Sequence, residues 1–175
     1  MADTMTLSMP RFASAVAADR PIRVLVVDDE KAVCDLLVSF LKSLSYEVET
    51  AADGLEALDK YAHSHFDLVL TDLSMPNMDG LELARQLREL DDEAVVLMIT
   101  GYPTIGSAVE AIKQGATDYI TKPFALDEIK IRLEKAIGTK TLRGRLKSVQ
   151  GLAWGLAFSI PLWLILGIAL AFILK

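Results

Sequence analysis

The 175-residue chain contains five short apolar runs, and each is followed by a stretch in which apolar residues recur at helical spacing. Short runs rich in β-branched residues are typical of strands, and repeats at every third or fourth position are typical of amphipathic helices. Strands that alternate with helices pair in parallel through right-handed crossovers. The pattern therefore predicts an α/β fold, a doubly wound parallel sheet of five strands with five helices. The predicted strands are Ile22–Val27, Glu47–Ala51, Phe66–Leu70, Ala94–Ile99 and Asp118–Thr121.

Local signals mark the ends of several predicted elements. Glu47–Ala51 alternates apolar and polar residues, which favours an edge strand. Asp53 and Asp79 precede helical repeats as N-cap residues, and Glu82 follows Asp79 at the spacing of a capping box. Gly115 is placed to close a helix. Apolar residues recur at helical spacing in each predicted helix: Val33, Leu36, Leu37, Phe40, Leu41 and Leu44; Leu55, Leu58 and Tyr61; Leu83, Ala84, Leu87 and Leu90; Ile105, Ala108, Val109 and Ile112; and Ile129, Leu133 and Ile137. We expect these residues on the inward stripes of the helices.

Charge is distributed unevenly along the chain. All 24 Asp and Glu residues precede residue 139, together with 13 of the 18 Lys and Arg residues, which gives that part a net charge of −11. Nucleic-acid binding needs a basic face, so we expect no nucleic-acid partner. The single cysteine, Cys34, excludes an internal disulfide, fits a reducing compartment and lies on an apolar helix face. Residues 1–20 lack the apolar segment of a signal peptide, and we expect a flexible N-terminal tail.

Polar residues stand where four of the predicted strands end: Asp28 and Asp29, Asp72, Thr100, and Lys122. The carboxyl ends of parallel strands meet at one edge of the sheet, where open α/β folds place their chemistry. Clustered carboxylates repel one another, and a hard divalent cation such as Mg²⁺ offsets that repulsion. Lys122 and Thr100 could contact phosphoryl oxygens, and Asp72 could be the nucleophile of an in-line phosphoryl transfer. The sequence thus predicts a phospho-accepting site at this edge.

Four motifs together resemble the receiver domain of two-component response regulators. They are VVDDE at 26–30, TDLSMPNMDG at 71–80, ITG at 99–101 and DYITKPF at 118–124, within a predicted receiver domain of residues 21–138. The resemblance implies a flavodoxin-like fold with strand order 2-1-3-4-5. It also implies a regulatory phospho-acceptor, not an enzyme, although such domains assist their own phosphotransfer and dephosphorylation.

The resemblance also assigns roles to individual residues. Asp72 would accept a phosphoryl group from a sensor histidine kinase or a phosphotransfer protein. Mg²⁺ would be held by Asp29, Asp72 and the main-chain carbonyl of Ser74, with Asp28 assisting. The remaining implied residues are Lys122 and Thr100, which share the catalytic role with Asp72, Tyr119 as the switch aromatic, and Pro123 after a cis peptide bond.

Two other classes of protein use related architecture. A phosphatase of the haloacid dehalogenase type needs a second Asp two residues after its nucleophile as general acid, and Ser74 occupies that position. A flavin-binding module needs a small-residue phosphate loop after the first strand, where this chain has the acidic sequence DDEKA. Both alternatives are therefore disfavoured.

Residues 151–174 contain no charged residue. The 23 residues from Leu152 to Leu174 would form a helix about 35 Å long, enough to cross a hydrocarbon core of about 30 Å. The linker at 139–150 carries four basic residues, which favour the cytoplasmic side. We therefore expect a transmembrane helix at 151–174 and a receiver on the cytoplasmic face of the inner membrane.

Output would then occur by contact with a downstream protein, with homodimer formation open. The alternative is a soluble single-domain receiver, or a fragment of a longer regulator, whose apolar tail is buried in a partner.

Overall fold

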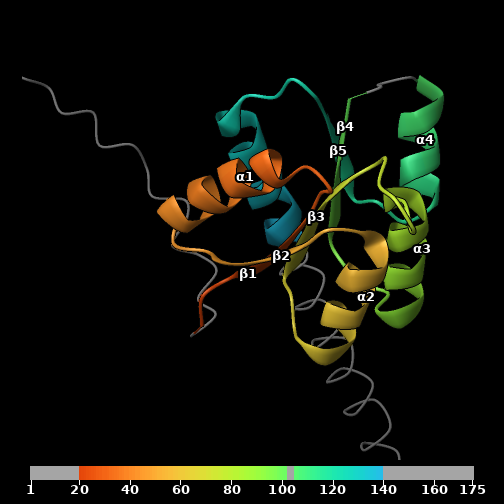
Figure 1. The fold of residues 1–175 in the computed structure, drawn as a ribbon, viewed down its shortest axis with the longest axis horizontal. Helices are drawn as coiled ribbons and strands as arrows, with labels where there is room; N and C mark the ends of the chain where they lie inside the picture. Colours follow the sequence, from red (N-terminus) through yellow and green to blue (C-terminus); the bar gives the residue numbers. More distant parts are fainter. Residues whose placement is uncertain (1–19, 102–104, 140–175) are drawn as a thin grey trace, which may run out of the picture. The chain divides into compact units, whose positions relative to one another are not determined.

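The computed structural model describes residues 20–101 and 105–139 (Figure 1). Its strands are β1 (Arg23–Val27), β2 (Glu47–Ala51), β3 (Leu68–Asp72), β4 (Val96–Thr100) and β5 (Asp118–Thr121). They alternate with α1 (Lys31–Ser43), α2 (Gly54–His63), α3 (Gly80–Leu90) and α4 (Ile105–Lys113), and a fifth helix covers residues 126–139. The alternation of strands and helices is the one that the sequence predicts.

All five strands are parallel, and their order is β2-β1-β3-β4-β5. This is the flavodoxin-like order that the resemblance implied, and it confirms β2 as an edge strand. The chain leaves β1 in one direction to form β2 and returns on its other side to form β3. Such a reversal opens a crevice at the carboxyl ends of the strands, which is where ligands bind in open α/β sheets.

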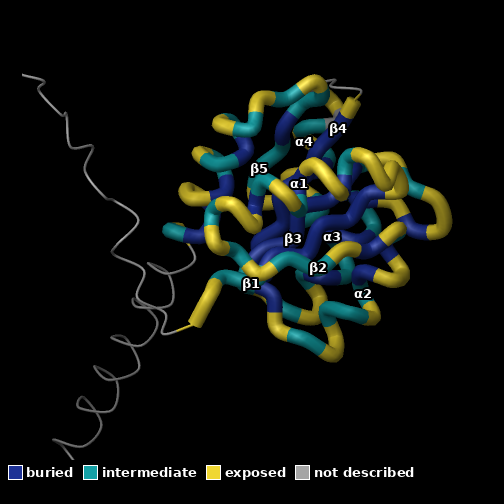
Figure 2. Tube along the Cα trace, turned by 60° about the vertical axis from the view of Figure 1, so that its left-hand side comes forward, coloured by how far each residue is buried: buried dark blue, intermediate teal, exposed yellow. Residues whose placement is uncertain are grey.

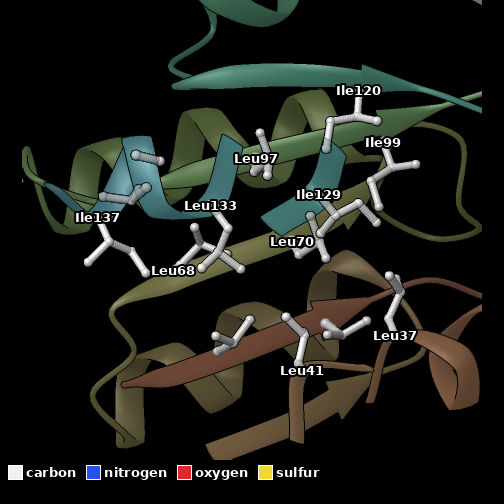
Figure 3. Packing of buried hydrophobic residues seen from close by; sticks show 14 of the residues in the cluster. Leu37, Leu41, Leu68, Leu70, Leu97, Ile99, Ile120, Ile129, Leu133 and Ile137 are labelled. Carbon is white, nitrogen blue, oxygen red and sulfur yellow. The ribbon is translucent and has the colours of Figure 1, made fainter. Parts of the chain in front are cut away.

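The sheet separates two apolar clusters because neighbouring residues of a strand point to opposite faces. Val24 and Val26 pack in the cluster beneath α1 and the fifth helix, whereas Leu25 and Val27 pack in the cluster beneath α2, α3 and α4. Figure 3 shows the first cluster, in which leucines of α1 and isoleucines of the fifth helix meet β3, β4 and β5. Figure 2 shows that the buried residues concentrate in the sheet, which gives the strand ends a rigid base.

Two predicted strands begin two residues later in the chain than expected. β3 begins at Leu68 instead of Phe66, and β4 begins at Val96 instead of Ala94. Phe66 is buried, but its ring stacks on Tyr61 with centroids 6.1 Å apart. The apolar character of that position therefore reflects packing against a helix. The shift brings Asp72 into the strand as its last residue.

Several apolar helix residues face solvent, in contrast to the prediction. Leu36, Leu55, Leu90, Val109 and Ile112 are between 47% and 60% exposed. Small residues occupy the sheet-facing lines of three of these helices, at Ala57, Ala84 and Ala111. They allow a close approach to the sheet, so larger residues on the flanks of each helix remain outside.

The predicted helix caps are mostly correct. The carboxylates of Asp53 and Asp79 accept hydrogen bonds from the main-chain N–H groups of the third helical residues, Glu56 and Glu82. The reciprocal half of the capping box is wrong, because the Glu82 carboxylate instead accepts from Arg85 and Gln86. Gly115 follows α4 with a φ of 110°, the left-handed conformation expected of a closing glycine.

No helix within residues 20–101 and 105–139 is long and apolar enough to span a bilayer. The expected transmembrane segment at 151–174 lies outside the described residues. The same is true of the linker apart from residue 139 and of the N-terminal tail apart from residue 20.

Candidate functional site

All four buried polar residues of the described part of the chain lie at the carboxyl ends of strands, which form one edge of the sheet. They are Asp28, which directly follows β1, Thr71 and Asp72 at the end of β3, and Thr100 at the end of β4. The Asp28 and Asp72 residues are only 4% and 7% exposed. Carboxylates are rarely buried to this degree without a cationic partner, so the edge is an energetically unusual place.

Lys122 supplies the cationic partner. Its Nζ lies 2.7 Å from Oδ1 of Asp72 and 3.0 Å from Oδ2 of Asp28. Its main-chain N–H donates to the carbonyl of Thr100 at 2.7 Å, which fixes it beside β4, and the Lys122–Pro123 bond is cis, as the resemblance implied. Burial favours the neutral amine, but the hydrogen bonds to Asp72 and Asp28 outweigh it, so the pKa of Lys122 lies above its ordinary value. One ammonium is thus shared by two carboxylates.

The neighbours of Asp28 hold it in place. Its Oδ1 accepts from the main-chain N–H of Glu30 at 2.9 Å, and its own N–H donates to Ala51 of the edge strand. Asp29 is exposed at the surface, in contrast to Asp28. Cys34 is buried in the apolar cluster beneath α1, which confirms that cysteine as a core residue, and burial, followed by the charge of Asp28, raises the pKa of its thiol.

The loop after β3 folds back over Asp72. The main-chain N–H of Ser74 donates to Oδ2 of Asp72 at 2.7 Å, and the N–H of Gly80 donates to the carbonyl of Leu73. A Cβ atom at position 80 would lie 2.2 Å from the carbonyl oxygen of Asp72, so only glycine permits this approach. Both oxygens of the Asp72 carboxylate are therefore oriented by neighbouring donors, Lys122 on one and Ser74 on the other.

Thr100 and Tyr119 line a pocket between the sheet and α4. Its empty volume is about 180 Å³, part of which is open to solvent. Thr100 is buried, whereas Tyr119 is half-buried. The pocket is lined by Leu73, Met98, Thr100, Ala108, Ala111 and Tyr119.

The donor chemistry at this edge fits a hard cation. Asp28 and Asp72 provide buried carboxylate oxygens, Asp29 stands next to them in sequence, and Ser74 contributes main-chain polar groups beside Asp72. Oxygen ligands of this kind suit Mg²⁺. Among the described residues, no three Asp, Glu, His or Cys side chains are gathered so as to hold a metal by themselves. A cation here would accordingly need main-chain oxygen or water as well.

The sequence motifs did not indicate one contact near these strand ends. The side-chain amide of Asn77 donates to Oδ2 of Asp53 at 2.6 Å and so joins the β3–α3 loop to the start of α2. Asn77 has a φ of 61°, and an Asn in a turn after Pro76 is the signal that could have indicated this conformation.

Comparison with known proteins agrees with this geometry. Residues 24–134 match the family of response regulator receiver domains. The chain is similar to the response regulator MprA of Mycobacterium sp. (strain KMS), with 44% identity over 113 residues, which is 65% of this chain and 49% of the relative. It is also similar to the transcriptional regulatory protein ZraR of Klebsiella oxytoca, with 39% identity over 66% of this chain and 26% of that protein.

Among solved structures, the crystal structure of a CheY-like response regulator receiver domain protein from Methanospirillum hungatei JF-1 matches with a TM-score of 0.68 and 31% identity, over 71% of this chain and 99% of that one. The chain therefore spans about half, or less, of the curated relatives named here, but nearly all of this solved receiver domain.

Proposed function

Because the chain belongs to the family of response regulator receiver domains, a regulatory family of two-component signalling, we propose that Asp72 is its phosphoryl acceptor. The donor would be a sensor histidine kinase or a phosphotransfer protein. The observation that carries the proposal is the pair of buried carboxylates, Asp28 and Asp72, that share the single ammonium of Lys122. This arrangement concentrates negative charge beside a nucleophile and leaves a cation within reach of an incoming phosphoryl group.

In the transfer, an oxygen of Asp72 attacks the phosphorus of a phosphohistidine. The new O–P bond forms as the P–N bond breaks, and the electron pair of that bond stays on the imidazole nitrogen. Lys122, already 2.7 Å from Asp72, neutralises a phosphoryl oxygen as it arrives, and the Thr100 hydroxyl donates to another. The same groups would assist later hydrolysis, so the domain regulates its own phosphorylation without being an enzyme for a separate substrate.

Mg²⁺ would be held by Asp28, Asp29, Asp72 and the Ser74 main-chain carbonyl. When bound, it neutralises the carboxylates together with the phosphoryl oxygens. The buried position of two of these residues supports the assignment, because a second positive charge beside Lys122 balances the acid excess at this edge.

The pocket between Thr100 and Tyr119 suggests how phosphorylation is transmitted. Movement of the Thr100 side chain toward a phosphoryl oxygen would free space beside it, and the half-buried Tyr119 ring would move into the pocket. This is a shift between two packings of one fold.

The test is phosphorylation by acetyl phosphate with Mg²⁺, followed by intact-mass measurement. We expect the wild type to gain one phosphoryl group, and we expect Asp72→Asn or a chelator to abolish the gain. Asp59→Asn, an exposed aspartate on α2, is the matched control and should be labelled like the wild type. Labelling of Asp72→Asn at the wild-type level would refute the proposal.

We further propose that the receiver faces the cytoplasm, tethered to the inner membrane by residues 151–174, and acts by contact with a downstream protein or as a homodimer. Support comes from the uncharged run and the basic linker of the sequence. Full-length protein should resist alkaline extraction from membranes. Protein truncated after Gly138 should be soluble and still phosphorylated.

Arginine at both Leu164 and Leu166 tests the tether further, because each mid-membrane charge costs about 2.5–3.5 kcal/mol on insertion scales. This variant should leave the membrane fraction. Recovery of the intact wild-type chain as a soluble monomer would contradict the tether. Recovery in a soluble complex would favour the alternative, a tail buried in a partner.

A further inference from the structure

The start of α2 and the β3–α3 loop are joined by two hydrogen bonds. Oδ2 of Asp53 accepts from the Asn77 side-chain amide at 2.6 Å, and the main-chain N–H of Gly54 donates to the carbonyl of Met78 at 3.2 Å. The other oxygen of Asp53, Oδ1, accepts from the N–H of Glu56 at 2.9 Å as the helix cap. One carboxylate thus serves two structures, the first turn of α2 and the loop that follows Asp72.

The contact between the two segments is tight. A Cβ atom at Gly54 would lie 2.6 Å from the side chain of Met78 and 2.7 Å from its carbonyl oxygen. Met78 is itself buried, at 8% exposure. The absence of a side chain at residue 54 therefore lets Asp53 come within hydrogen-bonding distance of Asn77.

The loop held in this way has an uncommon backbone. Asn77 adopts the left-handed conformation with a φ of 61°, and the N–H of Met78 donates to the carbonyl of Pro76 at 2.7 Å. Few residues other than glycine adopt this conformation readily, although asparagine tolerates it. At the other end of the same loop, the N–H of Ser74 contacts Oδ2 of Asp72.

We propose that Asp53 is a positioning residue, which holds Asn77 so that the main chain at Ser74 is arranged around Asp72 before a divalent cation binds. This inference rests on the proposed function, since it concerns the cation site of the Asp72 centre. The N–H of Glu56 and then the Asn77 amide hold the pKa of Asp53 below its ordinary value, so the acceptor is ionised at neutral pH.

The energetic consequence follows from the population of the competent loop. A ligand binds more weakly in proportion to the fraction of molecules whose site is already arranged. If removal of the Asn77 contact lowers that fraction, the apparent Kd for Mg²⁺ rises, while the phosphorylation rate at saturating Mg²⁺ stays near that of the wild type.

Two substitutions separate the Asp53–Asn77 hydrogen bond from the other roles of these two residues. Asn77→Gly removes the side-chain amide but keeps access to the left-handed conformation. Asp53→Ser keeps a helix-capping oxygen but leaves none for Asn77. We expect each in the full-length protein to raise the Kd for Mg²⁺, measured by calorimetry, about three- to tenfold. The double variant should have a Kd for Mg²⁺ no higher than that of the single variant with the higher Kd, since both substitutions break the same contact.

Hydrogen exchange of the metal-free protein gives a second readout. The amide of Ser74 should exchange about three- to tenfold faster in Asn77→Gly than in the wild type, while amides of the central strands are unchanged. A Kd within twofold of the wild type in Asn77→Gly, or additive effects in the double variant, would overturn the proposal, whatever happens to thermal stability. Failure of the proposed function would show differently, as labelling that does not depend on Asp72.

Discussion

Charged residues are paired differently at the two ends of the strands of the sheet. We call the end where the strands begin the amino edge and the end where they finish the carboxyl edge. At the amino edge, Asp67 accepts two hydrogen bonds from the Arg20 guanidinium, at 2.8 and 3.1 Å, and one from the N–H of Arg23. Arg23 also pairs with Glu49 at 2.6 Å and lies over the Phe66 ring. At the carboxyl edge, Asp28 and Asp72 each accept one main-chain N–H, from Glu30 and Ser74, and among the described residues the cation that pairs with them is the single ammonium of Lys122.

The difference separates charges that support the fold from charges that we propose to act in phosphoryl transfer. At the amino edge the arginines are partly exposed and joined to their acids by several hydrogen bonds. At the carboxyl edge the acids are buried and outnumber the ammonium that contacts them. An excess of buried carboxylate costs stability unless a further cation binds, which fits the proposal that the carboxyl edge binds a cation whereas the amino edge supports the fold.

Replacement of Lys122 by Met should have the largest effect on stability. It leaves two buried carboxylates without their ammonium, and breaking such a pair costs about 3 kcal/mol. We expect a loss of this size in the free energy of unfolding, measured by denaturant titration without Mg²⁺. Addition of Mg²⁺ should recover part of this loss. If Lys122→Met instead has the free energy of unfolding of the wild type, the buried carboxylates cost no more stability without Lys122 than with it, and the contrast between the two edges fails.

The pH dependence of stability should separate the two edges. The pKa of Lys122 lies above 10.5 in the folded protein, so its contribution is complete below pH 10.5 and is lost as pH rises through the folded value. Burial opposes ionisation of Asp67, but the hydrogen bonds from Arg23, Arg20 and His65 outweigh it and hold its pKa below 3.8. Its contribution is therefore complete above pH 3.8 and is lost as pH falls through the folded value.

Matched variants isolate these contributions from those of other groups. The stability difference between wild type and Lys122→Met should shrink as pH rises above about 10.5, and the difference for Asp67→Asn should shrink as pH falls below about 3.8. Denaturant unfolding across pH measures both. A Lys122→Met difference that stays constant above pH 10.5, or an Asp67→Asn difference that stays constant below pH 3.8, would break the comparison.

Replacement of Arg20 by Met should have the smallest effect. The Arg20 side chain is 47% exposed, and surface ion pairs contribute about 0.2–1 kcal/mol. The loss should decrease in 1 M salt, because screening already weakens the pair there, with Lys113→Met, a change at an exposed lysine of α4, as the control. If Arg20→Met lowers the free energy of unfolding as much as Lys122→Met does, the ion pairs of the two edges contribute equally and the comparison fails.

The sequence allowed the sheet, its edge strand and the strand-end residues to be predicted, because buried parallel strands leave continuous apolar runs. The exact strand starts could not be predicted. Phe66 extends the apolar run, but its ring packs on Tyr61 of α2 and the residue lies outside the strand. The exposed face of α4 was also missed, because its close approach to the sheet through Ala111 depends on tertiary packing.

The residues of the candidate site could be predicted only in part from the sequence. Asp28, Asp72, Thr100 and Lys122 lie together as their strand-end positions indicated. The link between Asp53 and Asn77 joins residues 24 positions apart, and local turn signals do not specify such a partner.

The most direct test of the central claim is chemical mapping of the phosphorylated residue. Borohydride reduces an aspartyl phosphate to homoserine, so wild-type protein treated with acetyl phosphate and Mg²⁺ and then reduced can be digested and sequenced by mass spectrometry. We predict homoserine at position 72 and unmodified aspartate at positions 28 and 29. Homoserine at either of those positions, with Asp72 intact, would contradict the account.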